Sequence, residues 1–146
     1  VTDQDGKVVG RTQPDEPVTA LIGHRFLVPG LEKALDGHEK GDELIKRFAD
    51  VLREVYSLYG ITARIGGDEF VAILNNVSVQ ETEKLISDML ILIETKNKED
   101  DILKLSTAYG YAMSDEVADS NPHIIYKLAD DRMYEYKKKS KMGRND

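Results

Sequence analysis

The chain has 146 residues, of which 40% are hydrophobic and 32% charged, and it contains no cysteine. This length and balance fit one soluble domain with a single core. The absence of cysteine excludes disulfides and thiolate metal sites. A formal net charge of −7 argues against binding to nucleic acid duplexes, which needs a basic face, and no apolar run approaches the length of a membrane span.

The first 17 residues are expected to form a lead-in to the domain. A turn at Asp5-Gly6 suits a small hairpin, and a polar segment bounded by Pro14 and Pro17 follows it. Such a lead-in suits either the end of an upstream module or a solvated tail. We therefore expect a hairpin and linker over residues 1–17 and one domain over residues 18–146.

Residues 18–35 are predicted to be helical. Thr19 can cap a helix, and Pro29-Gly30 predicts a kink or a restart within it. Apolar residues recur at near-helical spacing, namely Leu21, Ile22, Phe26, Leu27, Leu31 and Leu35.

A turn over residues 36–42 leads into a second, strongly periodic helix. Its apolar stripe consists of Leu44, Phe48, Leu52, Val55 and Tyr59. Asp42 stands where this helix begins, a position at which the helix dipole favours an acid.

Residues 61–74 predict two short strands joined by a tight turn with the sequence Gly-Gly-Asp-Glu-Phe. Gly66 and Gly67 can adopt positive φ and allow a ligand to approach the backbone. Asp68 and Glu69 repel each other and attract a divalent cation, and oxygen ligands of this kind suit magnesium, which usually arrives with substrate phosphates. An acidic surface hairpin is the alternative interpretation.

The remaining chain predicts a helix over residues 79–94, a charged loop over residues 95–101 and a strand over residues 103–113. A last helix begins after Ser120-Asn121-Pro122 and ends in a basic run of Lys137, Lys138, Lys139 and Lys141. This run is either a solvated face, with cations favoured near the helix C-terminus, or a contact with triphosphate oxygens through Lys137.

Several of these segments, in the same order, resemble motifs of the GGDEF family of diguanylate cyclase domains. Residues 37–42 match G-H-x-x-G-D, and residues 66–70 match the motif that names the family. Residues 18–27, 106–112 and 129–137 are similar to the family's L-T-G-L-x-N-R-R-x-L, T-x-S-x-G-x-A and A-D-x-A-x-Y-x-A-K motifs.

The resemblance implies an α+β fold of the nucleotide-cyclase type, with a mostly antiparallel sheet flanked by helices. It implies that two domains, meeting as a homodimer, condense two GTP molecules into cyclic di-GMP and release pyrophosphate in bacterial second-messenger signalling. Asp68 and Glu69 would be catalytic and would hold Mg²⁺ or Mn²⁺. The substrate-binding residues implied are His38, Asp42, Gly66, Gly67 and Lys137.

Family members often carry an upstream sensory or regulatory domain, so the resemblance implies such a partner. It also implies a cytoplasmic domain without nucleic acid or direct membrane contact, although the parent protein could be membrane-anchored. Many of these enzymes have an inhibitory R-x-x-D motif before the glycine turn. The corresponding residues 57–60 read Ser-Leu-Tyr-Gly, so feedback through that motif is not expected.

One family segment is absent, the central strand ending in D-x-D and followed by F-K-x-I-N-D. Its first aspartate is a metal ligand in the family. Three explanations are open: an omitted segment, a degenerate domain that lost the strand, or a strand formed by residues 25–28 without a carboxylate. The edges that a lost central strand would expose favour the omitted segment. A degenerate GGDEF domain that binds GTP or dimerises without catalysis, and an unrelated ferredoxin-like domain, are the alternative functions.

Overall fold

The computed structural model describes residues 18–26, 39–99 and 104–144. These residues form a four-stranded antiparallel sheet with the strand order β2-β3-β1-β4. The strands are β1 (Val18–Phe26), β2 (Gly60–Arg64), β3 (Glu69–Asn75) and β4 (Thr107–Met113). The α+β architecture expected from the sequence is confirmed.

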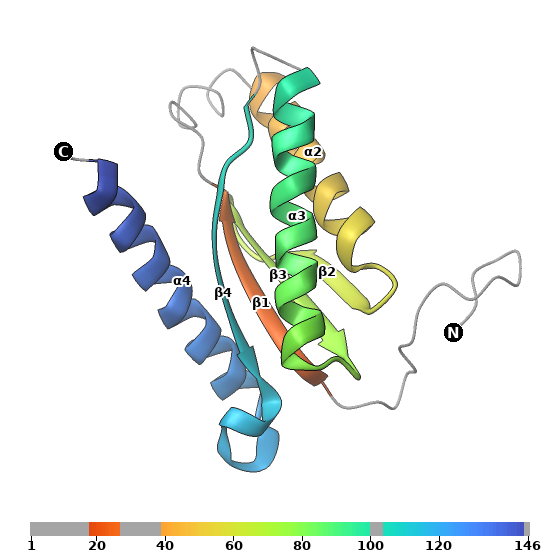
Figure 1. The fold of residues 1–146 in the computed structure, drawn as a ribbon, viewed down its shortest axis with the longest axis vertical. Coiled ribbons are helices and arrows are strands. Elements are labelled where there is room, and N and C mark those ends of the chain that lie inside the picture. Colours follow the sequence, from red (N-terminus) through yellow and green to blue (C-terminus); the bar gives the residue numbers. More distant parts are fainter. Residues whose placement is uncertain (1–17, 27–38, 100–103, 145–146) are drawn as a thin grey trace, which may run out of the picture.

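Helices cover both faces of this sheet, as Figure 1 shows. Helices α2 (Glu39–Tyr56) and α3 (Val79–Glu99) lie on one face and share the larger buried cluster with the strands. Helix α4 (Pro122–Arg144) lies on the other face, where Ile125 and Ala129 pack against Leu21, Val71 and Ala112. Two short 3₁₀ turns, Ser114–Glu116 and Ala118–Ser120, connect β4 to α4.

The predicted helix over residues 18–35 is wrong in its described part, because residues 18–26 form β1. This strand lies in the interior of the sheet, between β3 and β4, and helices pack on both faces of it: Ala20 and Ile22 belong to the cluster shared with α2 and α3, and Leu21 to the cluster shared with α4. Ala20, Leu21 and Ile22 are consecutive and all almost fully buried. A strand buried on both faces shows a continuous apolar run, which periodicity alone does not distinguish from a helix.

The centre of the sheet is therefore occupied, and the preference for an omitted segment is not supported. Both β3 and β4 pair with β1, so their edges that face the centre of the sheet are not left open. The strand includes Arg25 and Phe26 of the third explanation and extends upstream from them to Val18. Leu27 and Val28, which that explanation also included, lie outside the described residues, as do residues 1–17.

The predicted hairpin is confirmed, with β2 and β3 paired from Gly60↔Leu74 to Arg64↔Phe70. The second helix is also confirmed as α2, whose Leu44, Phe48 and Leu52 are buried. Tyr59 of the predicted stripe lies beyond the end of this helix. Clear alternation in the strands and a clear 3.6-residue period in the helix account for this agreement.

Helix α3 begins as its sequence indicates and ends later than predicted. Ser78 and Glu81 form a capping box, with Ser78 Oγ accepting from the Glu81 amide at 3.0 Å and Glu81 Oε1 accepting from the Ser78 amide at 3.2 Å. The helix continues to Glu99, so the predicted loop is wrong over residues 95–99. Glutamate and lysine in this stretch are good helix formers, and Glu94 and Lys98 form an i,i+4 ion pair.

Helix α4 begins at the predicted cap and approaches β4 very closely. Asn121 Oδ1 accepts from the His123 amide at 2.9 Å, and Pro122 occupies the first helical position. A Cβ on Gly110 would lie 2.2 Å from the Met133 backbone nitrogen. Glycine at this position therefore allows the helix backbone to lie directly on the strand.

Candidate functional site

The glycine turn joins β2 to β3 and is held from within by Arg64. The Arg64 guanidinium donates to the carbonyl oxygens of Gly66 at 3.0 Å and of Gly67 at 2.9 Å. The amides of Ile65 and Gly66 donate to the carbonyl oxygen of Glu69, which closes the turn. Both glycines are exposed, and nothing lies within 4 Å of a Cβ built on Gly67, so the backbone there is open to a ligand.

Glu69, the first residue of β3, points its carboxylate toward other elements of the domain. Tyr126 of α4 donates its hydroxyl to Glu69 Oε1 at 2.7 Å. Arg25 of β1 lies at 3.5 Å from Glu69 Oε2, and the two residues are directly opposed in the strand register. Only 20% of the Glu69 side chain is exposed, so this carboxylate has both of its oxygens engaged inside the protein.

Asp130 of α4 completes this cluster. Burial raises the pKa of Asp130, and the charge of Glu69 and a hydrogen bond with it raise the pKa further, while Arg25 opposes the shift. Burial and the hydrogen bond to Glu69 raise the pKa of Tyr126 to about 12, so its hydroxyl stays a donor at neutral pH. Arg25, Glu69, Tyr126 and Asp130 thus form one charged cluster between β1, β3 and α4, which we call the Arg25 cluster.

The other predicted site residues are described to different extents. Asp68 lies in the turn and is partly buried, and Asp42 lies exposed in the first turns of α2. The N-terminal end of α2 and the C-terminal end of β1 lie toward the same end of the molecule in Figure 1. His38 lies outside the described residues; Lys137 lies within α4, but its side chain is not among those described.

The side chains around Glu69 do not fit the magnesium site that the resemblance implies. In the described part of the chain, no three His, Asp or Glu side chains come together closely enough to hold a metal ion. The strand residue opposite Glu69 is an arginine, whose charge repels a cation, whereas magnesium prefers several oxygen ligands.

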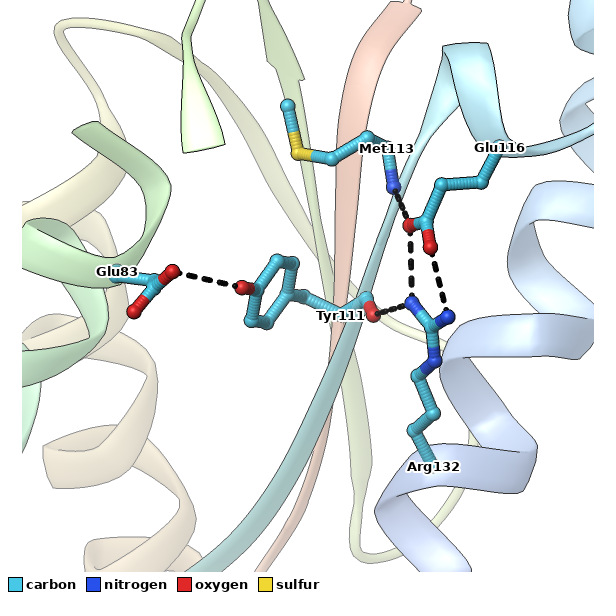
Figure 2. Close-up of polar contacts among 5 residues, drawn as sticks. All are labelled: Glu83, Tyr111, Met113, Glu116 and Arg132. Carbon is cyan, nitrogen blue, oxygen red and sulfur yellow. Dashed lines mark hydrogen bonds and ion pairs between the residues drawn. The ribbon is translucent and has the colours of Figure 1, made fainter. Parts of the chain in front are cut away.

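A wide groove of about 660 Å³ lies away from the predicted site, along the free edge of β4, and its lining includes Tyr109, Tyr136 and Arg132. Figure 2 shows Arg132 donating to the backbone carbonyl of Tyr111 at 2.9 Å and pairing with both oxygens of Glu116. Glu116 also accepts from the Met113 amide at 2.8 Å. These side chains occupy backbone groups of the edge strand, which limits its pairing with another strand.

The sequence analysis missed three members of the Arg25 cluster. Arg25 is 44 residues from Glu69, and Tyr126 is 57 residues from it, so no local spacing links them. One signal was available in the sequence. Arg25 follows the apolar run of residues 20–22, close to the place where the family has its D-x-D motif. Recognising that run as a strand would have placed Arg25 beside the glycine turn.

Comparison with known proteins decides the family. The family model for "Diguanylate cyclase, GGDEF domain" matches residues 32–143. This chain belongs to the GGDEF family. Among solved structures, the active GGEEF domain of a diguanylate cyclase from Vibrio cholerae resembles this GGDEF domain with a TM-score of 0.69 at 20% identity, over 84% of this chain and 78% of that one.

Curated relatives of this GGDEF domain are much longer proteins. DgcT of Escherichia coli K12, a probable diguanylate cyclase, is 31% identical over 113 residues, which are 75% of this chain and 24% of DgcT. The signaling protein YkoW of Bacillus subtilis is 32% identical over 108 residues, which are 72% of this chain and 13% of YkoW. Within the described ranges, no helix is both long and apolar enough to cross a bilayer.

Proposed function

We propose that this GGDEF domain is a signalling module that binds a guanine nucleotide and does not convert it to cyclic di-GMP. One observation carries the proposal: the carboxylate of Glu69, which the family resemblance makes catalytic, is engaged by Arg25 at 3.5 Å and by Tyr126 at 2.7 Å. A carboxylate that is paired with a guanidinium is a weak ligand for a second cation.

Binding without turnover is supported by features that do not depend on Glu69. The glycine turn presents open backbone, and Arg64 fixes its carbonyl groups in place. Asp42 is exposed on α2, where its carboxylate is free to accept the paired donors of guanine. Exposed backbone and an exposed acid can contribute to recognition of a nucleotide, whereas condensation also needs a charge-stabilising site for the transferring phosphoryl group.

A second candidate is the diguanylate cyclase reaction itself, in which a homodimer condenses two GTP molecules and releases pyrophosphate. The retained Gly66, Gly67, Asp68 and Glu69 turn and the similarity to DgcT favour it. In either case we place the domain in the cytoplasm, where GTP is found. We also propose an upstream sensory or regulatory domain, since the matched segment is only 24% of DgcT and 13% of YkoW.

The two candidates are separated by following the nucleotide. The protein is incubated with GTP and Mg²⁺ or Mn²⁺, and the products are resolved by chromatography; we expect GTP to be recovered and no cyclic di-GMP to form. In parallel, a fluorescent GTP analogue is titrated against the protein and against Asp42→Ala, with unlabelled ATP and GTP as competitors. We expect GTP to compete, ATP to compete poorly, and Asp42→Ala to bind at least about tenfold more weakly.

Formation of cyclic di-GMP would overturn the proposal in favour of the cyclase. Absence of nucleotide binding by the folded protein would overturn the binding half of the proposal and leave a purely dimerising module. Glu54→Ala is a suitable control for Asp42→Ala, because it removes an exposed acid from the same helix.

A further inference from the structure

The Arg25 cluster contains a cation that belongs to the protein chain. Arg25 stands near the end of β1 and pairs in register with Glu69 on one side and Ala108 on the other. Its backbone is fixed, because the Thr107 hydroxyl donates to the Arg25 carbonyl oxygen at 3.0 Å. The guanidinium is therefore held beside the acidic turn by the sheet itself.

We infer that Arg25 is a built-in counter-ion that takes the place of a divalent metal beside Glu69, and that its replacement by an acid creates a metal site in this domain. The inference rests on the proposed function, which it deepens by naming the residue that prevents metal-dependent chemistry. It concerns the cation, however, and can be tested without any nucleotide.

The first argument is charge balance. Glu69 and Asp130 are two carboxylates, and Arg25 supplies one positive charge between them, since it pairs with Glu69 and lines the same small cavity as Asp130. With arginine in place, a divalent cation would approach a group with a net charge of about −1, and the guanidinium would repel it. With aspartate in place of arginine, the cluster would contain three carboxylates, which is the oxygen-rich set that a hard cation prefers.

The second argument is space. Arg25, Asp130, Met133 and Tyr134 line a cavity of about 60 Å³ next to the cluster. Aspartate is much shorter than arginine, so the substitution enlarges this cavity while leaving the backbone anchor at Thr107 unchanged. The enlarged space would admit a cation with some of its water ligands, which Mn²⁺ and Mg²⁺ retain in most protein sites.

The third argument is that the pair is not an ordinary surface ion pair. The Arg25 and Glu69 side chains are 34% and 20% exposed, so both are partly shielded from solvent. Tyr126 holds the remaining oxygen of Glu69 at 2.7 Å, which fixes the carboxylate toward Arg25. A fixed and shielded carboxylate is a better ligand than a mobile surface one once the competing cation is removed.

The test is a titration of the protein with Mn²⁺ alone, with free Mn²⁺ followed by electron paramagnetic resonance. The proteins are the unaltered chain, Arg25→Asp, Arg25→Gln and the control Arg53→Gln, which removes a positive charge from an exposed pair on α2. We expect Arg25→Asp to bind one Mn²⁺ at least about tenfold more tightly than the unaltered chain, and Arg25→Gln to show a smaller gain. Arg53→Gln should behave as the unaltered chain, and adding Asp130→Asn to Arg25→Asp should remove the gain.

Equal Mn²⁺ affinity of the unaltered chain and a folded Arg25→Asp variant would overturn the inference. If Arg25→Asp does not fold, as judged by circular dichroism, the neutral variant Arg25→Gln decides: a gain over Arg53→Gln supports the inference and no gain overturns it. Cyclic di-GMP synthesis by the unaltered chain would instead overturn the proposed function, so the two failures are distinguishable.

Discussion

At the residue scale, His24 is an unusual member of the core. It is fully buried in β1, its ring lies 5.5 Å from that of Tyr56 and 6.2 Å from that of Phe48, and both of its nitrogens lack a hydrogen-bond partner among the described residues. Burial lowers the pKa of His24 to about 3. The folded protein therefore holds this imidazole neutral, and charging it requires the core to open.

We predict that His24 makes stability depend on pH. The pKa of His24 is lower in the folded state than the ordinary value of 6.5, so the unfolded chain takes up this proton at a higher pH than the folded protein does. The free energy of unfolding is therefore at its full value above pH 6.5 and decreases as the pH falls toward 3. The loss should reach about 5 kcal/mol as an upper bound. His24→Leu should remove this component and, by eliminating two unpaired nitrogens, raise the free energy of unfolding by about 1–2 kcal/mol at pH 7.

Urea unfolding of both proteins between pH 7 and pH 4 measures these effects. His123→Leu, at an exposed position on α4, is the matched control and should keep the acid sensitivity of the unaltered protein. If the free energy of unfolding of His24→Leu fell with pH as steeply as that of the unaltered protein, groups other than His24 would cause the acid sensitivity.

Tyr126 provides a second prediction at this scale. Tyr126→Phe removes the hydroxyl that donates to Glu69 at 2.7 Å and leaves one oxygen of a mostly buried carboxylate without that donor. We expect a loss of about 1–2 kcal/mol in the free energy of unfolding, measured by urea denaturation. Tyr134→Phe on the same helix, at a side chain that is 63% exposed, should change stability by less than about 0.5 kcal/mol.

At the scale of elements, the contact between α4 and β4 depends on the absence of a side chain at Gly110. A Cβ there would meet the backbone of Met133 at 2.2 Å and the carbonyl oxygen of Ala129 at 2.4 Å. We predict that Gly110→Ala costs at least about 3 kcal/mol, because backbone atoms cannot move aside as a flexible side chain can.

Gly23→Ala on the adjacent strand is the matched control for this prediction. Its Cβ would lie 3.6 Å from the Met133 sulfur, which is ordinary contact, so we expect a change of less than about 1 kcal/mol. Thermal unfolding of the two variants compares them directly. Equal transition temperatures would mean that α4 does not lie on β4 at this distance.

The Arg132–Glu116 pair links the end of β4 to α4 (Figure 2). Its hydrogen bonds with Arg132 hold the pKa of Glu116 below the usual carboxyl value. The stability that the pair contributes is therefore present above the ordinary carboxyl pKa and is lost as the pH falls through the lowered one. Since both side chains are about one-third exposed or more, we expect Glu116→Gln to cost only about 1 kcal/mol at pH 7.

Chemical denaturation at pH 7 and at pH 3 checks this prediction, because the difference between the unaltered protein and Glu116→Gln should shrink at the lower pH. Asp88→Asn, which breaks an exposed i,i+4 pair with Lys84, should have less than half that effect at pH 7. A difference that persists unchanged at pH 3 would contradict the role of the carboxylate charge.

The elements also explain what the sequence could and could not predict. The hairpin and α2 were predictable because each has a clear period, and the start of α3 and of α4 can be read from Ser78 and Asn121. Strand β1 was mistaken for a helix because Ala20, Leu21 and Ile22 are buried on both faces and show no alternation. The pairing of Arg25 with Glu69 depends on the register of that strand, so it could not be predicted once the strand was missed.

At the scale of the whole molecule, the GGDEF architecture is preserved, and we propose that the chemistry at its turn is changed. The sheet places the end of β1 beside the glycine turn, so the residue at position 25 decides which charge Glu69 meets. Here that charge is the positive charge of the Arg25 guanidinium, which is part of the chain itself. A fold that is intact around an altered site is what we expect of a domain retained for binding and signalling.

Turnover of GTP is the measurement that tests this account most directly. The unaltered protein, at concentrations high enough to favour pairing of two domains, is incubated with GTP and Mn²⁺ beside an active GGDEF-family cyclase as positive control, and cyclic di-GMP is quantified by mass spectrometry. We predict that GTP remains while the positive control consumes it. Sustained formation of cyclic di-GMP by this chain, with loss of product in Glu69→Gln, would contradict the account.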